Sequence, residues 1–229
     1  MSEATYLLAI DTCGPSGSVA LGRLSGQSIE VLGQIELEGR SYSATLVAAV
    51  GDLLAQYSIA LRDLAAMVVV NGPGSFTGVR VGLAAVKGLA EPSQIPVVAV
   101  SRLEVLAARS HTHAAALDAH RHELFLRLGD HELLAGAPEL AAVHPAPTQV
   151  ALCDQAAAEL LSSAWPATAL IPTAPPTAAD ALTLCAPRVE AREFVDLALL
   201  DGNYLRRSDA EIFGPEPFAE SATAASQHP

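Results

Sequence analysis

Short apolar runs separated by turn residues dominate the first hundred residues and predict strands. Several of these runs are rich in β-branched residues and are too short for helices, which favours buried strands. The first run ends at Asp11 and is followed by a Gly/Ser-containing turn, after which the chain returns in a second run. The predicted strands cover residues 6–10, 18–22, 29–36, 67–70 and 96–100.

Helical periodicity fills the intervals between the later strands. We predict helices over residues 41–57, from Ser75 to about residue 90, and from a Ser101 cap to residue 109. Pro92 is expected to end the second helix. The order is three strands, then helix and strand in alternation, which predicts a strand meander followed by right-handed crossovers in an α/β fold.

The second half of the chain has a weaker pattern. We predict strands over residues 115–118 and 123–128 and helices over 156–163 and 178–198. From residue 208 onward the chain is polar and contains Pro and Gly, which indicates a loosely held tail. The resulting division is an N-terminal lobe over residues 1–110, a smaller lobe over 111–208 and a flexible tail over 209–229.

Composition narrows the classes of function. The 229 residues carry a formal charge of −12 with only 13 Lys and Arg. Because nucleic-acid binding depends on phosphate neutralisation, direct binding by this chain is disfavoured, and an acidic, soluble scaffold or a subunit beside a basic partner fits better. Three scattered cysteines suggest free thiols in a reducing compartment. Without a recognisable leader or a long uncharged apolar segment, we expect a soluble cytoplasmic protein and no membrane partner.

Residues 71–83, Asn-Gly-Pro-Gly-Ser-Phe-Thr-Gly-Val-Arg-Val-Gly-Leu, form the most distinctive segment. A strand, a Gly-rich turn with Gly74, and a helix start at Ser75 could make an anion site or a tight corner needed only for packing. The segment is not a P-loop, because Lys87 lies well inside the helix, and Ser75 lacks the frame of a nucleophile elbow. Gly74 and Ser75 therefore stay weak candidates for cofactor binding.

Asp11 and Thr12 are the other weak candidates for cofactor binding. A carboxylate at the end of a first strand could hold a magnesium–water shell in a nucleotide cleft, or it could stabilise a turn. Four histidines at 111, 113, 120 and 122 could suggest a metal site. No zinc signature accompanies them, so solvated histidines are favoured and no metal or catalytic residue is predicted.

Two of the predicted helices have more apolar surface than one sheet contact requires. They could cover each other within a monomer, or they could form a subunit interface. In the second case a bulky residue at Gly82 or Ala85 should abolish the complex and leave the monomer folded. The candidate interface residues are Leu46, Val50, Leu53, Tyr57, Gly78, Gly82, Ala85 and Leu89.

Several of these segments together resemble the bacterial TsaB (YeaZ) family. The resemblance is carried by residues 8–12, 18–21 and above all the Gly-Pro-Gly-Ser-Phe-Thr-Gly-Val-Arg block at 72–80. Shorter matches occur at 100–103, at 117–125 and at 204–206, so that the resemblance covers about residues 6–207. Members of this family are subunits of the machinery that installs threonylcarbamoyl on tRNA.

The resemblance implies an actin/hexokinase-like (ASKHA) fold of two lobes with a degenerate second lobe. It implies a non-catalytic scaffold that binds and activates the catalytic paralogue TsaD and helps to recruit the ATPase TsaE, with tRNA reached only through the complex. The helices at 41–57 and 75–90 would pair with TsaD, or with a second copy in a homodimer. Tyr42 stands where relatives often have histidine.

The same resemblance implies no cofactor of the chain's own, although ATP or ADP could bind where the subunits meet. The alternative is a minimal actin-like nucleotide-binding ATPase that uses Asp11 and the 72–78 turn. A third interpretation, a peptidase, is not supported, because the sequence contains neither a zinc signature nor a recognisable Ser triad.

Overall fold

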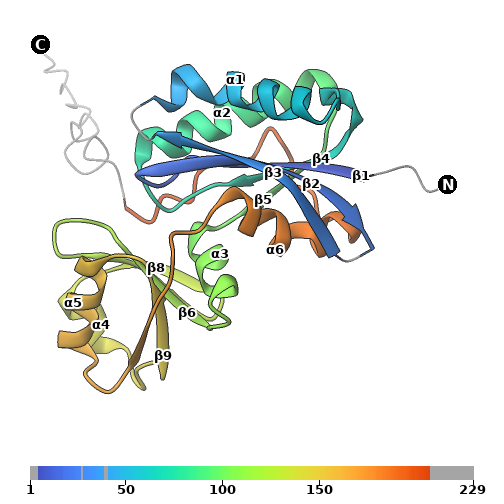
Figure 1. The fold of residues 1–229 in the computed structure, drawn as a ribbon. Helices are drawn as coiled ribbons and strands as arrows, with labels where there is room; N and C mark the ends of the chain where they lie inside the picture. The colour runs from blue at the N-terminus through green and yellow to red at the C-terminus, as the bar shows by residue number, and fades with distance from the viewer. Residues whose placement is uncertain (1–4, 27, 39–40, 207–229) are drawn as a thin grey trace, which may run out of the picture.

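Each of the two lobes is built on a five-stranded mixed sheet (Figure 1). The computed structural model describes residues 5–26, 28–38 and 41–206. The first sheet has the order β3-β2-β1-β4-β5, in which β1, β2 and β3 form an antiparallel meander and β4 and β5 run parallel to β1. Its strands are β1 (Thr5–Asp11), β2 (Ser16–Ser25), β3 (Ser28–Glu38), β4 (Leu64–Val70) and β5 (Val97–Val100).

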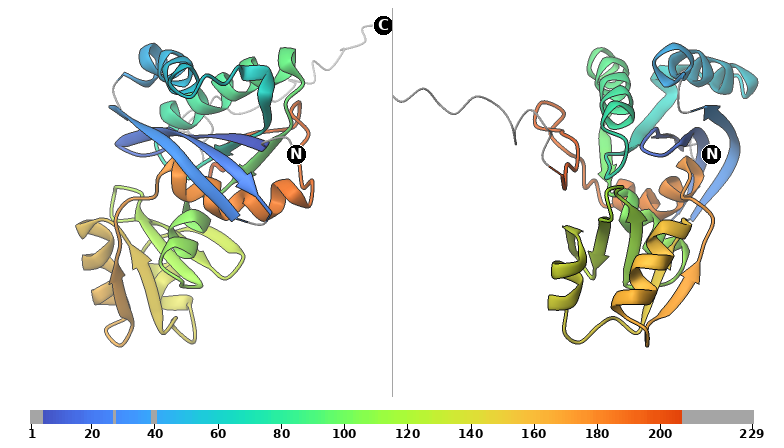
Figure 2. Two further views of the ribbon diagram at one scale, coloured as in Figure 1. Left: turned by 45° about the vertical axis from the view of Figure 1, so that its right-hand side comes forward. Right: turned by 90° about the vertical axis from the view of Figure 1, so that its left-hand side faces the viewer.

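Three helices enclose the first sheet. Helices α1 (Tyr42–Gln56) and α2 (Phe76–Ser93) cover one face, and α6 (Ala178–Glu190) covers the other (Figures 1 and 2). A short 3₁₀ turn, η1 (Leu61–Asp63), leads into β4. The large apolar residues of all three helices share one buried cluster with the strands, so each helix is held by its inward row.

The second sheet has the order β10-β9-β6-β7-β8. Helices α4 (Ala137–Ala142) and α5 (Gln155–Ala164) pack on one side of it, and α3 (Arg102–Arg109) packs on the other and also contacts α6. Its strands are β6 (Ala114–Asp118), β7 (Leu124–Leu128), β8 (His131–Ala135), β9 (Gln149–Leu152) and β10 (Ala169–Pro172).

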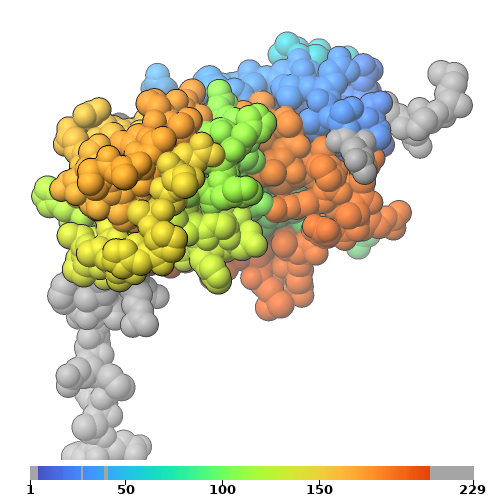
Figure 3. Space-filling model, turned by 90° about the horizontal axis from the view of Figure 1, so that it is seen from below, coloured from blue at the N-terminus to red at the C-terminus, as the bar shows by residue number. Residues whose placement is uncertain are grey.

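The fold class is confirmed: an actin-like arrangement of two mixed α/β lobes follows the predicted strand and helix order. The predicted division into lobes differs in one respect. Helix α6 falls in the predicted second lobe, but it packs across all five strands of the first sheet. Seen from below, it lies beside the second lobe (Figure 3). The first lobe is therefore made from two separate stretches of chain.

Other differences lie in the second half. The predicted helix over 178–198 ends at Glu190, and Arg192 follows with a positive φ of 57°. Helix α4 and strands β8, β9 and β10 were not predicted. The predicted tail lies outside the described residues. Among the helices of the described ranges, none combines the length and apolar character needed to cross a membrane.

Candidate functional site

The candidate site lies where the three parallel strands of the first sheet end. Asp11 is the last residue of β1, Asn71 follows β4, and Arg102 comes two residues after β5. In open α/β sheets, this edge is where ligands usually bind. The structure brings Asp11, Thr12, Gly74 and Ser75 together here, as the two weak cofactor hypotheses required. The packing between them determines whether anything else can enter.

The Gly-rich turn rests directly on the segment that follows β1. A Cβ atom added at Gly74 would lie 2.2 Å from the Cys13 carbonyl oxygen, and one added at Gly78 would lie 2.0 Å from the Thr12 carbonyl oxygen. The Thr12 hydroxyl also donates a hydrogen bond of 2.7 Å to the Gly78 carbonyl. The glycines therefore admit the protein's own backbone, and this favours the packing interpretation of the turn.

Ser75 completes this corner as the N-cap of α2. Its hydroxyl accepts a hydrogen bond from the Gly78 backbone N–H at 3.3 Å, and its own N–H donates to the Cys13 carbonyl at 2.8 Å. A cap of this kind satisfies one of the free N–H groups at the helix start, which an anion would otherwise attract.

Asp11 faces a buried arginine that the sequence reasoning did not identify. The Arg102 Nε atom lies 3.7 Å from Asp11 Oδ2, and the two side chains are 7% and 1% exposed. The other carboxylate oxygen accepts a hydrogen bond of 2.8 Å from the Cys13 backbone N–H. A Cβ at Gly14 would come within 2.4 Å of the Arg102 guanidinium, so that glycine makes room for it.

The electrostatics of this cluster follow from its burial. Desolvation raises the pKa of the Asp11 carboxyl, although Arg102 and the Cys13 N–H act in the opposite direction. Tyr42 closes the cluster by donating a hydrogen bond of 2.9 Å to the Gly14 carbonyl, and burial, assisted by Asp11, raises the pKa of its phenol to about 12. Tyr42 therefore contributes a neutral hydroxyl to the cluster.

A magnesium–nucleotide complex does not fit this cluster. A divalent ion requires several oxygen ligands around the carboxylate, but both Asp11 oxygens already face protein donors and the nearest charge is a guanidinium. The Gly74 and Gly78 side of the turn is already occupied by the Thr12 and Cys13 backbone, which leaves no open surface there for phosphates. Position alone could have pointed to Arg102, because it directly follows a capping serine at the end of a strand parallel to β1.

The four histidines do not form a metal centre with other ligands in the described part of the chain. Within those residues, no group of three or more His, Cys, Asp or Glu side chains is arranged to hold a metal ion. His111, His120 and His122 have positive φ values of 52°, 60° and 61°, which places them in turns. His120 Nδ1 lies 2.9 Å from Asp118 Oδ2 with its side chain 86% exposed.

Most of the predicted interface residues point into their own lobe. Leu46, Val50 and Leu53 are 1%, 3% and 1% exposed and belong to the core over the first sheet. A Cβ at Gly82 would lie 2.5 Å from the Thr12 hydroxyl oxygen, so a bulky residue there would disrupt the monomer itself. Gly78 is buried against Thr12, and Tyr57, Ala85 and Leu89 are half-buried.

The outward rows of the same two helices are different residues. On α1 the row is small and apolar, and Val47 at its centre is 59% exposed. A Cβ added at Gly51 of α1 or at Gly88 of α2 would meet no atom within 4 Å. We call this surface the outer helix face; it comprises Ala44, Val47, Ala48, Gly51, Ala55, Ala84 and Gly88.

Comparisons with known proteins agree on one group. A family model described as "TsaD: tRNA N6-adenosine threonylcarbamoyltransferase" matches residues 31–152, just over half of the chain. The tRNA threonylcarbamoyladenosine biosynthesis protein TsaB of Bacillus subtilis is 40% identical over 102 residues, which are 44% of this chain and 43% of that protein. The TsaB of Haemophilus influenzae is 33% identical over 125 residues, 52% and 51% of the two chains.

The matches to these curated relatives thus span about half of their length or less. A solved structure, YeaZ from Pseudomonas aeruginosa, extends the similarity further: it is 30% identical with a TM-score of 0.68 and covers 88% of this chain and 100% of that one. The sequence block at 72–80, the two-lobe fold and these similarities together lead to one assignment. The chain belongs to the TsaB (YeaZ) family, within the wider group that the TsaD model describes.

Proposed function

We propose that this chain acts in the biosynthesis of threonylcarbamoyladenosine in tRNA as an accessory subunit that does not perform the transfer itself. Its relatives from Bacillus subtilis and Haemophilus influenzae are named for that pathway. The observation that carries the accessory role is the Asp11–Arg102 pair. A buried guanidinium stands beside the carboxylate that an actin-like enzyme would use for a metal-bound nucleotide.

The proposed partner is the catalytic paralogue TsaD. The matching family model is that of the transferase, and the fold of the two subunits is accordingly related. We place the contact on the outer helix face, because Gly51 and Gly88 leave open space there and would let another helix approach closely. Burial of aliphatic surface contributes roughly 25 cal/mol per Å² before the costs of association.

In this scheme the chain stabilises the active form of TsaD and helps to recruit the ATPase TsaE, and tRNA is reached through the complex. A second copy of the chain would occupy the same face when TsaD is absent. ATP or ADP would be held where the subunits meet, outside the cluster around Asp11. The acidic charge of −12 is in keeping with a subunit that leaves direct tRNA contacts to its partners.

The test is threonylcarbamoylation of tRNA by the TsaD of the same organism, with and without this chain. We expect the two proteins to co-purify and the modification to depend on both. Full modification without the chain, or modification by the chain without TsaD, would refute the accessory role. Co-purification without any change in activity would leave the chain as a binding partner that does not activate TsaD, against the proposal.

A further inference from the structure

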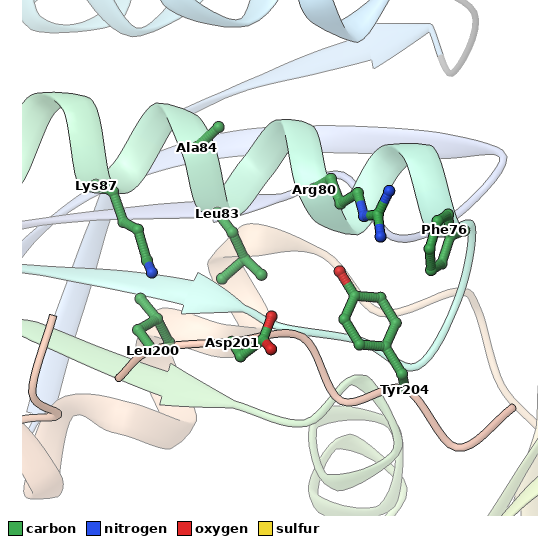
Figure 4. Close-up of a pocket in the computed structure, with 8 residues that line it drawn as sticks. All are labelled: Phe76, Arg80, Leu83, Ala84, Lys87, Leu200, Asp201 and Tyr204. Carbon is green, nitrogen blue, oxygen red and sulfur yellow. The ribbon is translucent and has the colours of Figure 1, made fainter. Parts of the chain in front are cut away.

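A groove of about 390 Å³ runs between α2 and the last described segment of the chain (Figure 4). It lies on the first lobe, beside the outer helix face and away from the Asp11 cluster. Two basic side chains project from α2 into a groove whose other lining residues are aromatic or aliphatic, apart from Asp201. The residues that matter for recognition are Phe76, Arg80, Lys87, Leu200, Asp201 and Tyr204.

The two cations of the groove have no ion-pair partner within the described ranges. The Arg80 guanidinium carbon lies 3.7 Å from the centre of the Phe76 ring and 6.0 Å from that of Tyr204. Stacking of this kind leaves the N–H edges of arginine free to bind a carboxylate. The acidic residue of the groove, Asp201, accepts its neighbour's N–H, from Gly202, at 2.7 Å and forms no ion pair with Arg80 or Lys87.

The apolar part of the groove is also open. The Phe76 ring lies 5.2 Å from that of Tyr204, centre to centre, and Phe76 remains 40% exposed. Leu83 and Leu200 also line the groove and are each 6% exposed. The chemical complement of this surface is an acidic segment that also carries aromatic side chains.

We propose that the groove binds the C-terminal segment of the same chain, residues 207–229. That segment has four carboxylates, one arginine and two phenylalanines, so it matches the groove in charge and in apolar character. Its acidic and aromatic residues are Asp209, Glu211, Phe213, Glu216, Phe218 and Glu220.

The C-terminal segment is attached next to the groove, and this favours it over a segment from another molecule. The segment begins after Arg206, two residues beyond Tyr204, which itself lines the groove. Arg206 is held to Glu123 of the second lobe, which fixes where the segment starts. At about 3.3–3.6 Å per extended residue, Phe213 can reach about 25 Å from Arg206. Attachment at this distance gives an effective concentration on the order of millimolar.

The test uses the full chain with the photo-reactive analogue p-benzoylphenylalanine in place of Phe218. We expect cross-links, mapped by mass spectrometry, to fall mainly in residues 76–87 and 200–204. Arg80→Glu and, separately, Lys87→Glu should lower their yield at least fivefold. Arg62→Glu, the same charge change at an exposed position of the same lobe, should leave the yield unchanged.

A mixture of ¹⁴N- and ¹⁵N-labelled protein shows whether the groove binds the tail of its own chain or that of a second copy. Cross-links within one isotope support the proposal. Cross-links between isotopes would show that the groove takes the tail of a second copy and would overturn it. Cross-links spread over the surface, or a yield unaffected by either groove variant, would also overturn it. TsaD is absent from this experiment, so its outcome is independent of the proposed function.

Discussion

Asp11 and Arg102 hold opposite charges in a place where water does not compensate either. A buried ion pair of this kind contributes little net stability, since desolvation offsets the attraction, but removing one partner leaves a costly unpaired charge. The consequence here concerns ligand binding: both carboxylate oxygens of Asp11 already face protein donors. The Arg102 Nε atom makes no hydrogen bond within the described residues, so the guanidinium is held mainly by charge and packing.

The first prediction concerns the pH dependence of stability in Asp11→Asn. Burial raises the pKa of Asp11 above its ordinary value of 3.8. Its contribution to the free energy of unfolding is therefore fully present below that value and is lost as the pH rises through the raised pKa. Urea unfolding at pH 4 and at pH 8 measures the free energy of unfolding of the variant and of the parent. Between pH 4 and pH 8, this free energy should change in favour of the variant relative to the parent. A shift in favour of the parent would mean that Arg102 outweighs burial.

The second prediction concerns the three cysteines. Burial raises the pKa of the Cys13 thiol well above its ordinary value and that of Cys185 to about 12, and both side chains are almost wholly inaccessible. Cys153 is partly exposed, although burial raises its pKa too. In the native protein a thiol reagent at pH 8 should label Cys153 slowly and the other two far more slowly still. Three equivalents should react in denaturant, and rapid native labelling of Cys13 would contradict this packing.

Helix α2 packs closely against the rest of the lobe on one side and leaves open space on the other, and its glycines show this difference. Gly78 lies against the backbone of Thr12, whereas a Cβ at Gly88 would meet no atom within 4 Å. Neither has a positive φ, so alanine is compatible with the helix at both positions. The two residues are therefore a matched pair on one element.

The third prediction follows from that pair. Gly88→Ala should raise the free energy of unfolding by about 1 kcal/mol, because glycine is a poor helix former. Gly78→Ala should lower it by about 1–3 kcal/mol or more, because the added methyl must displace the Thr12 backbone. Chemical denaturation of the two variants measures both effects. Equal effects of the same sign would contradict the one-sided packing of α2.

The predicted elements were most accurate where the hydrophobic periodicity agrees with the positions of capping and turn residues. Residues 6–109 have clear apolar runs and a serine cap at Ser75, and their strands and helices were placed within a few residues. Pro92 does not end α2 as predicted, because the helix continues through it to Ser93. In the second half, β9 and β10 are only four residues long and α4 only six. Such short elements depend on tertiary packing and carry little local signal.

The position of the candidate site was predicted from the sequence, but the pairing of its carboxylate with a buried arginine was not. The end of a first strand and a Gly-rich turn locate Asp11 and Gly74 from local sequence. Arg102 lies 91 positions beyond Asp11, and its role depends on the pairing of β1, β4 and β5. Likewise, helical periodicity identified two apolar rows on α1, but only the sheet determines that the leucine row is buried and the alanine row faces outward.

At the scale of the whole molecule, the two lobes of an actin-like fold raise the question of whether this chain binds a nucleotide by itself. The fourth prediction is that calorimetry of the isolated chain with ATP and magnesium gives no binding below millimolar concentration. The physical reason is that Arg102 lies beside the Asp11 carboxylate and that the Thr12–Cys13 backbone packs closely against Gly74 and Gly78. Micromolar binding with turnover would instead support the alternative of a minimal ATPase.

The outer helix face offers a way to separate folding from assembly. A Cβ at Gly51 or Gly88 meets no atom within 4 Å, and glutamate favours helix more than glycine does, so the Gly51→Glu/Gly88→Glu variant should be at least as stable as the parent. Two charges in an apolar contact would, however, be costly when a partner covers them. Ser162→Glu on the exposed side of α5 in the second lobe is the matched control.

The most direct measurement is titration of TsaD with the parent chain, the Gly51→Glu/Gly88→Glu variant and the Ser162→Glu control, followed by tRNA threonylcarbamoylation with each. The account predicts that the double variant binds at least tenfold more weakly and loses activation in proportion, while the control matches the parent. Parent-like binding and activation by a folded double variant would contradict the proposal that this face holds the catalytic partner.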